Sequence, residues 1–193
     1  SYALMDRNIG NFGRTIGLVG ASRIGRKVAA MLVGFDFEIL LYDPFVQADD
    51  ALAASVQLVD LDTLMARSDI VSVHAPSLPS TRGMIGARQL RLMQDGAGFI
   101  NTARGALIDE AALLAELQTG RIHAVIDVTD PEIPGPDSPF FTLPNVFLTP
   151  HIAGAVGTER ARLGLMAVEE VERFVGGEPM LYEIEPSLLE RLA

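Results

Sequence analysis

The sequence predicts an α/β fold built on a doubly wound parallel sheet, and three observations support this prediction. Short apolar runs that suit buried strands alternate with amphipathic segments that suit helices. A glycine-rich turn, Gly20-x-Ser22-x-x-Gly25, joins the first strand to the first helix. An acidic residue, Asp43, follows the second strand. Because the chain has 193 residues, 49% of them hydrophobic, it can bury one sizeable core, and we expect one domain.

The expected elements follow one another in regular alternation. Strands are expected at residues 16–19, 38–42, 56–59, 70–74, 97–101, 123–128 and 146–149. Helices are expected from residue 24, over 47–54, 61–67 and 87–93, from 109 to 120, and over about 156–175. Asp60 and Asp109 are placed to cap two of these helices. On the last helix four apolar residues share one face, namely Leu163, Ala167, Val171 and Phe174.

In the first helix the pattern puts Ile24, Val28 and either Met31 or Leu32 on one face.

Parallel strands end at the same edge of a sheet, and ligands bind at that edge in folds of this kind. We therefore expect the site where the strands end, at Gly20, Asp43, His74, Asn101, Asp127 and Thr149.

The glycine-rich turn is close to the dinucleotide-binding fingerprint. Gly20 permits a sharp turn, position 22 lets the backbone approach a pyrophosphate, and Gly25 lets the helix pack closely on the strand. The free N–H groups at the helix start then receive the phosphates. Ser22 departs from the fingerprint, since its Cβ crowds the phosphate approach while its hydroxyl can donate to a phosphate oxygen. The alternative is an ordinary strand–helix turn.

Asp43 lies 18 positions after Gly25, where the fingerprint expects an acid that bonds the adenine ribose hydroxyls. Such a carboxylate favours NAD over NADP, because it repels a 2′-phosphate. The alternative is that an aspartate before Pro44 serves only the turn.

Composition narrows the classes of partner. A net charge of −10 argues against nucleic acid and anionic membranes. The absence of cysteine excludes disulfides and thiol chemistry and fits a reducing compartment. No apolar run reaches membrane-spanning length, and residues 1–14 contain no signal-peptide core, so we expect a cytoplasmic protein. Three dispersed histidines predict no metal site.

Three residues near the predicted edge, Arg104, Glu132 and His151, together suit the chemistry of a 2-hydroxy acid. Arg104 can clamp a carboxylate and polarise a carbonyl. His151 can exchange the hydroxyl proton, and Glu132 can fix its tautomer and favour the protonated ring. Each residue alone has an ordinary alternative as a solvated or structural side chain.

At these residues the sequence resembles the D-isomer-specific 2-hydroxyacid dehydrogenase family. The resemblance rests on the glycine-rich turn, Asp69-Ile-Val-Ser-Val-His-Ala-Pro76, Ile100-Asn-Thr-Ala-Arg-Gly105, Asp127-Val with Glu132, and Thr149-Pro-His-Ile-Ala-Gly154. It implies a Rossmann-type NAD-binding domain, with Arg104, Glu132 and His151 as the catalytic residues. The coenzyme-binding residues it implies are Gly20, Ser22, Arg23, Ile24, Gly25, Asp43, His74, Ala75, Pro76, Thr102, Ala103, Arg104, Asp127, His151 and Gly154. Glu132, where the formate dehydrogenase branch has glutamine, argues against that branch.

Family members also carry a substrate domain, built mostly from a preceding part of the chain that is missing here. By resemblance, residues 1–14 are expected to be an interdomain connector, 15–176 the NAD-binding domain, and 177–193 a segment returning toward the absent domain. We expect a homodimer that binds NAD and whose isolated chain turns over little 2-keto or 2-hydroxy acid. The sequence Asp127-Val-Thr-Asp-Pro-Glu132 favours the glyoxylate/hydroxypyruvate reductases or the phosphoglycerate dehydrogenases within this family. Two alternatives stay open: an NAD(H)-sensing, corepressor-like interaction protein of the same superfamily, and a purely structural domain.

Overall fold

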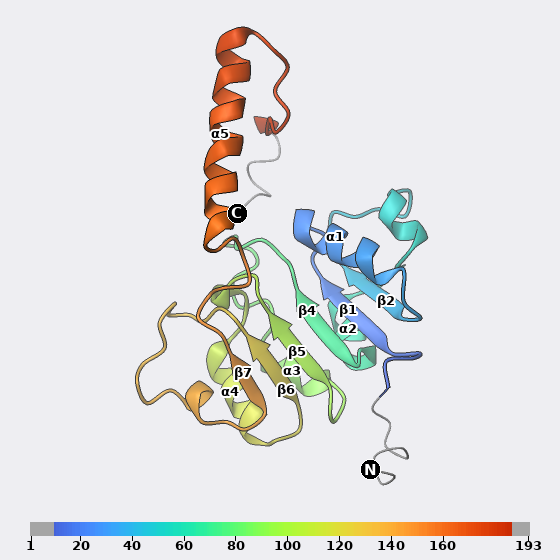
Figure 1. Ribbon diagram of the computed structural model, residues 1–193. Coiled ribbons are helices and arrows are strands. Elements are labelled where there is room, and N and C mark those ends of the chain that lie inside the picture. Colours follow the sequence, from blue (N-terminus) through green and yellow to red (C-terminus); the bar gives the residue numbers. More distant parts are fainter. Residues whose placement is uncertain (1–9, 187–193) are drawn as a thin grey trace.

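Seven parallel strands form one sheet in the computed structural model, which describes residues 10–186 (Figure 1). The strand order is β3-β2-β1-β4-β5-β6-β7, and every neighbouring pair is parallel. The strands are β1 (Thr15–Val19), β2 (Glu38–Tyr42), β3 (Gln57–Leu58), β4 (Ile70–Val73), β5 (Gly98–Asn101), β6 (His123–Ile126) and β7 (Val146–Leu148). All seven carboxyl ends therefore meet at one edge, which confirms the predicted fold class.

The helices alternate with the strands as expected. They are α1 (Arg23–Leu32), α2 (Leu61–Arg67), α3 (Ala87–Leu92), α4 (Glu110–Gln118) and α5 (Thr158–Gly176), with 3-10 turns η2 (Ala51–Ala54), η3 (Gly105–Leu107) and η4 (Pro139–Phe141). The predicted caps are confirmed, because Asp60 accepts from the N–H of Thr63 and Asp109 from that of Ala112. The helix expected over 47–54 is only the 3-10 turn η2, and the strand expected over 123–128 ends at Ile126.

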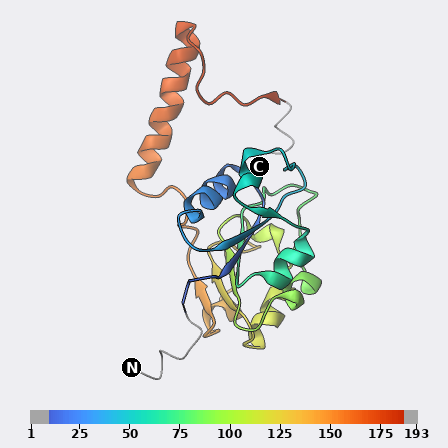
Figure 2. The same ribbon diagram turned by 90° about the vertical axis from the view of Figure 1, so that its right-hand side faces the viewer.

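Helices cover both faces of the sheet, as doubly wound topology requires (Figures 1 and 2). On one face α2, α3 and α4 bury the larger core, whose centre is Phe99. On the other face α1 and η2 pack over β1 and β2 around Leu18 and Leu41. Beyond α1 this second face is open over β6 and β7, where Val125 and Phe147 are exposed while Ala124 and Ile126 are buried on the opposite side.

The packing face of α1 differs from the predicted one. Gly25 and Ala29 are the buried residues of the helix, and Val28 and Leu32 pack beside them. Ile24 is 61% exposed, so placing it on the packed face was wrong. Val28 was placed correctly, and of the two alternatives Leu32 packs while Met31 is 74% exposed. The close approach of α1 to the sheet at Gly25 turns the helix by about one position relative to its most apolar face.

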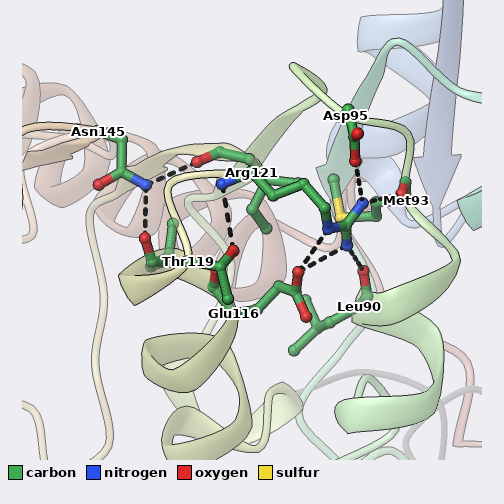
Figure 3. Close-up of polar contacts among 9 residues, drawn as sticks. Leu90, Met93, Asp95, Glu116, Thr119, Arg121 and Asn145 are labelled. Atoms are coloured by element: carbon green, nitrogen blue, oxygen red, sulfur yellow. Dashed lines mark hydrogen bonds and ion pairs between the residues drawn. The ribbon is translucent and has the colours of Figure 1, made fainter.

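Arg121 ties the ends of α3 and α4 together (Figure 3). Its guanidinium donates to the carbonyl oxygens of Leu90 and Met93 at the end of α3, and it pairs with Glu116 of α4. It also reaches Asp95 in the turn before β5. One half-buried cation thus satisfies the last carbonyls of α3 and fixes α4 beside it.

Helix α5 extends away from the sheet as a separate arm (Figures 1 and 2). None of its residues is buried, and Leu163, Val171 and Phe174 are 55%, 62% and 74% exposed. The apolar face predicted for it exists but is not covered by the rest of residues 10–186. Nowhere in this described part of the chain does a helix have both the length and the apolar character needed to cross a membrane.

Candidate active site

A cavity of about 910 Å³ opens at the carboxyl edge of the sheet, between the ends of β1, β2, β4 and β5. Its volume lies within the range typical of small-molecule sites. Eleven of the predicted site residues line it: Gly20, Ser22, Arg23, Ile24, Asp43, His74, Ala75, Pro76, Thr102, Ala103 and Arg104. The cavity therefore brings the predicted phosphate turn, ribose acid and substrate arginine to one place.

The glycine-rich turn has the geometry that its sequence predicts. Gly20 has φ of +101°, and a Cβ there would lie 2.5 Å from the backbone nitrogen of Ala75. A Cβ on Gly25 would lie 2.2 Å from the carbonyl oxygen of Gly20. Both positions thus require glycine, one for the turn and both for close approach.

Ser22 fits the turn for a reason that the sequence comparison with the fingerprint missed. Its φ of −59° is open to any residue, and its Oγ accepts from the N–H of Gly25 as the N-cap of α1. Serine is among the best N-cap residues. The hydroxyl hydrogen is still free to be donated into the cavity.

Asp43 is fixed at the end of β2 by two backbone donors. Its Oδ2 accepts from the N–H of Ala21 at 2.7 Å, and its Oδ1 from that of Phe45 at 2.8 Å. Each carboxylate oxygen can accept a second hydrogen bond, so the group can bind a pair of hydroxyls without leaving its place.

The turn that carries Arg104 is shaped by the buried side chain of Asn101. The Asn101 amide donates to the carbonyl of Arg104 at 3.0 Å and accepts from the N–H of Ala103 at 3.1 Å. The next residue, Gly105, lies so close to Thr129 that a Cβ would be 2.1 Å from the Thr129 carbonyl carbon. This contact holds the arginine turn directly against the loop that carries Glu132.

His151 and Glu132 are paired through a short contact between Nδ1 and Oε1. The two side chains are 44% and 57% exposed. His151 has φ of +53°, which is unusual for a residue with a Cβ, and its N–H donates to the carbonyl of Asp127 at 2.9 Å. The pair joins two loops, leaves Nε2 of the ring available, and suits exchange of a proton with a bound molecule.

Asp127 anchors the loop that carries His151. One carboxylate oxygen accepts from Thr149 Oγ1 at 2.5 Å and from the N–H of Ile152, and the other accepts from the N–H of Ala153. Burial raises the pKa of Asp127, but these hydrogen bonds outweigh it and hold the pKa below its ordinary value. The carboxylate is therefore ionised and acts here as a clamp on the loop.

His74 ends β4 as a buried group. Its Nε2 lies 2.9 Å from Ser72 Oγ, and burial holds the pKa of the ring below its ordinary value. The start of the His74 side chain lies against the glycine-rich turn, since its Cβ is 3.2 Å from a Cβ built on Gly25.

The structure does not gather all the predicted residues in one cavity. Asp127, Glu132, His151 and Gly154 lie outside the lining, on the neighbouring loops, and Gly25 lies beneath it. Residues that the sequence reasoning missed also line the cavity, among them Arg26, Tyr42, Phe45, Leu61, Thr81 and Met84. Several of these residues could have been identified from the sequence, because they lie close to the end of a strand or within the proline-rich loop after His74.

A doubly wound parallel sheet with this glycine-rich turn, and with an acid at the end of β2, defines a dinucleotide-binding domain of the dehydrogenase type. Comparison with known proteins identifies the family within this class. Residues 6–153 match the family model described as D-isomer specific 2-hydroxyacid dehydrogenase, NAD binding domain. The chain belongs to this family, and the resemblance seen in the sequence is confirmed.

Individual relatives agree with this assignment. The chain is 39% identical over 184 residues to a D-3-phosphoglycerate dehydrogenase of Archaeoglobus fulgidus, covering 92% of this chain and 35% of that protein. It is 40% identical over 181 residues to a glyoxylate reductase of Korarchaeum cryptofilum, covering 93% and 53%. The structure of a Lactobacillus jensenii D-lactate dehydrogenase with NAD+ matches with a TM-score of 0.77 at 31% identity, covering 89% and 56%. This chain thus spans about a third to a half of the length of these proteins.

Proposed function

We propose that this chain is the coenzyme-binding part of an enzyme that transfers hydride between NAD(H) and a D-2-hydroxy acid or 2-keto acid. The observation that carries the proposal is the meeting of two features at one sheet edge. The cavity contains the phosphate turn, Asp43 and Arg104, and the loop packed against the arginine turn carries Glu132, which pairs with His151.

The residues that line the cavity are suited to binding NAD. The N-terminus of α1 directs its backbone N–H groups at the turn where a pyrophosphate would lie. Asp43 has acceptor capacity for both hydroxyls of an adenine ribose and repels a 2′-phosphate. Tyr42, Leu61 and Phe45 supply apolar surface for a base.

The chemistry follows from the positions of three side chains. Bound NADH supplies a hydride for the carbonyl carbon of a 2-keto acid. Arg104 binds the substrate carboxylate through its guanidinium fork and polarises the carbonyl. His151 gives a proton to the carbonyl oxygen during reduction and takes it from the hydroxyl during oxidation. Glu132 orients the ring through Nδ1, so that Nε2 faces the substrate.

Residues 1–14 are proposed as a connector from a substrate domain and 177–193 as a segment that returns to it. Residues 1–9 and 187–193 of these segments lie outside the described part of the chain. The exposed His151–Glu132 pair supports a site that a second domain completes, because hydride transfer is faster in a site closed to water. We therefore expect the chain alone to bind NADH and to turn over little substrate. A homodimer is proposed on the same family grounds.

The test is a titration of this chain with NADH, followed by glyoxylate, hydroxypyruvate or 3-phosphohydroxypyruvate while NADH oxidation is recorded. These keto acids are chosen because the chain is similar to a D-3-phosphoglycerate dehydrogenase and to a glyoxylate reductase. NADH binding, with slow keto-acid-dependent oxidation that His151→Asn abolishes, supports the proposal. Absence of NADH binding overturns it.

A further inference from the structure

Arg26 of α1 is held by a fixed set of partners beside the coenzyme cavity. Its Nη1 and Nη2 donate to Asp50 Oδ1 and Oδ2 at 2.8 and 2.7 Å, in a two-pronged ion pair. Its Nε donates to the carbonyl of Ala21 at 3.2 Å. Asp50 is itself fixed, because its Oδ1 also accepts from the N–H of Leu52 as the cap of η2. Each of the three guanidinium nitrogens thereby has a hydrogen-bond partner.

This ion pair is next to the group that selects the coenzyme. Ala21 accepts a hydrogen bond from Arg26 through its carbonyl and donates one to Asp43 through its N–H, so a single residue links the two side chains. Arg26 lines the same cavity as Asp43, whereas Asp50 does not. The hydrogen bonds to Asp50, and to a smaller extent the negative charge of Asp43, raise the pKa of Arg26 above its ordinary value.

We propose that Asp50 is a specificity-determining residue, which holds Arg26 away from the ribose side of the cavity and so denies a 2′-phosphate its cation. This inference rests on the proposed function of the cavity as an NAD site. Arginine is the preferred partner of phosphate because its fork matches two phosphate oxygens. Discrimination against NADPH then has two parts: Asp43 repels the extra phosphate, and Asp50 occupies the nearby arginine that would bind it.

The chain offers a conservative test of this arrangement. Asp50→Asn keeps an oxygen that can accept from the N–H of Leu52, and because asparagine is an equally good N-cap residue, η2 is retained. It removes the charge that holds Arg26. The released arginine can then turn to a 2′-phosphate or to Asp43, and either movement lowers the preference for NADH over NADPH. Asp49→Asn removes the same charge from the adjacent exposed residue, which takes no part in the ion pair.

The quantity to measure is the ratio of the dissociation constants for NADPH and NADH, by calorimetric titration of the folded chain. We expect Asp50→Asn to lower this ratio by about fivefold or more, since one cation–phosphate contact is gained. Asp49→Asn should leave it within about twofold, because an exposed charge is screened. Adding Arg26→Ala to Asp50→Asn should restore the original ratio.

The outcomes separate this inference from the proposed function. If the unaltered chain binds neither coenzyme, the proposed function fails and the inference fails with it. If the chain binds NADH but Asp50→Asn leaves the ratio unchanged, the inference alone is overturned. A change that Asp49→Asn reproduces, or that persists when Arg26 is replaced, also overturns it, because the effect would not pass through this arginine.

Discussion

At the scale of single residues, the His151–Glu132 pair makes a definite prediction about catalysis. Glu132→Gln keeps a side chain of the same size but removes the carboxylate charge that faces Nδ1 of His151. We expect the steady-state rate of NADH-dependent keto acid reduction to fall by about 10²-fold or more. The dissociation constant of NADH should stay unchanged, because Glu132 lies outside the cavity lining. Equal losses in rate and in NADH affinity would contradict an orienting role.

His74 predicts how stability depends on pH. The ring is buried, so its pKa in the folded chain lies below the ordinary value of 6.5. Above pH 6.5 both folded and unfolded chains hold it neutral, and its contribution to stability is complete. As the pH falls from 6.5 toward the folded-state pKa, His74 becomes protonated in the unfolded chain but stays neutral in the folded chain. Protonation therefore stabilises the unfolded chain, and the free energy of unfolding decreases.

The measurement is the thermal midpoint at about pH 7.5 and about pH 5. We expect the unaltered chain to melt lower at the acidic pH. His74→Gln, which has no titrating ring, should show a smaller difference between the two conditions. The exposed His123, changed to Gln, is the matched control and should retain the full difference. A His74→Gln chain with an undiminished difference would assign the pH dependence to other groups.

At the scale of elements, the fit of α1 onto the sheet depends on one missing side chain. A Cβ on Gly25 would meet the backbone oxygen of Gly20 at 2.2 Å, and backbone cannot move aside as a side chain can. We expect Gly25→Ala to lower the free energy of unfolding by more than about 3 kcal/mol. Gly164→Ala, on a helix with open space around it, should instead stabilise α5 by about 0.5–1 kcal/mol. Chemical denaturation of both variants checks the contrast.

The junction of α3 and α4 gives a second prediction at this scale. Arg121→Ala would leave the carbonyls of Leu90 and Met93 and the nearly buried carboxylate of Glu116 without their cation. We expect a loss of about 2–3 kcal/mol in the free energy of unfolding. The exposed pair of Arg88 with Asp62 is the control, and Arg88→Ala should cost less than about 1 kcal/mol. Similar losses in the two variants would show that Arg121 is merely another surface charge.

Across the whole molecule, the sequence was sufficient for features that are encoded locally. Apolar periodicity located the strands and helices, and Asp60 and Asp109 marked two helix starts correctly, because a cap needs only the residues beside it. The carboxyl edge was predictable because parallel strands must end together. Pattern alone misplaced the packed face of α1, since that face is set by where the turn at Gly20 lets the helix approach.

Most polar contacts between distant parts of the chain could not be predicted from the sequence, and the pairing of Glu132 with His151 is the exception, because the chemistry expected of the two residues required it. Arg26 and Asp50 are separated by 24 positions, and Asp127 and Ala153 by 26, so no local rule pairs them. The exposed face of α5 shows the opposite case, in which a pattern predicts an apolar face correctly but not what covers it. Where no shared chemistry links two charged or polar residues, as with Arg26 and Asp50, their pairing therefore becomes known only from the fold.

At the scale of the whole molecule, the part of the proposed NADH preference that is assigned to Asp43 can be tested on the chain as it stands. Asp43→Ala removes the acceptor that we propose for the ribose hydroxyls and also the group that accepts from the N–H of Ala21. We expect NADH affinity to fall by about tenfold or more in calorimetric titration, while NADPH, repelled in the unaltered chain, loses little. Asp137→Ala, at an exposed site outside the cavity lining, should change neither. If Asp43→Ala weakened both coenzymes equally, the carboxylate would serve only the turn, and the preference for NADH would have to come from another group.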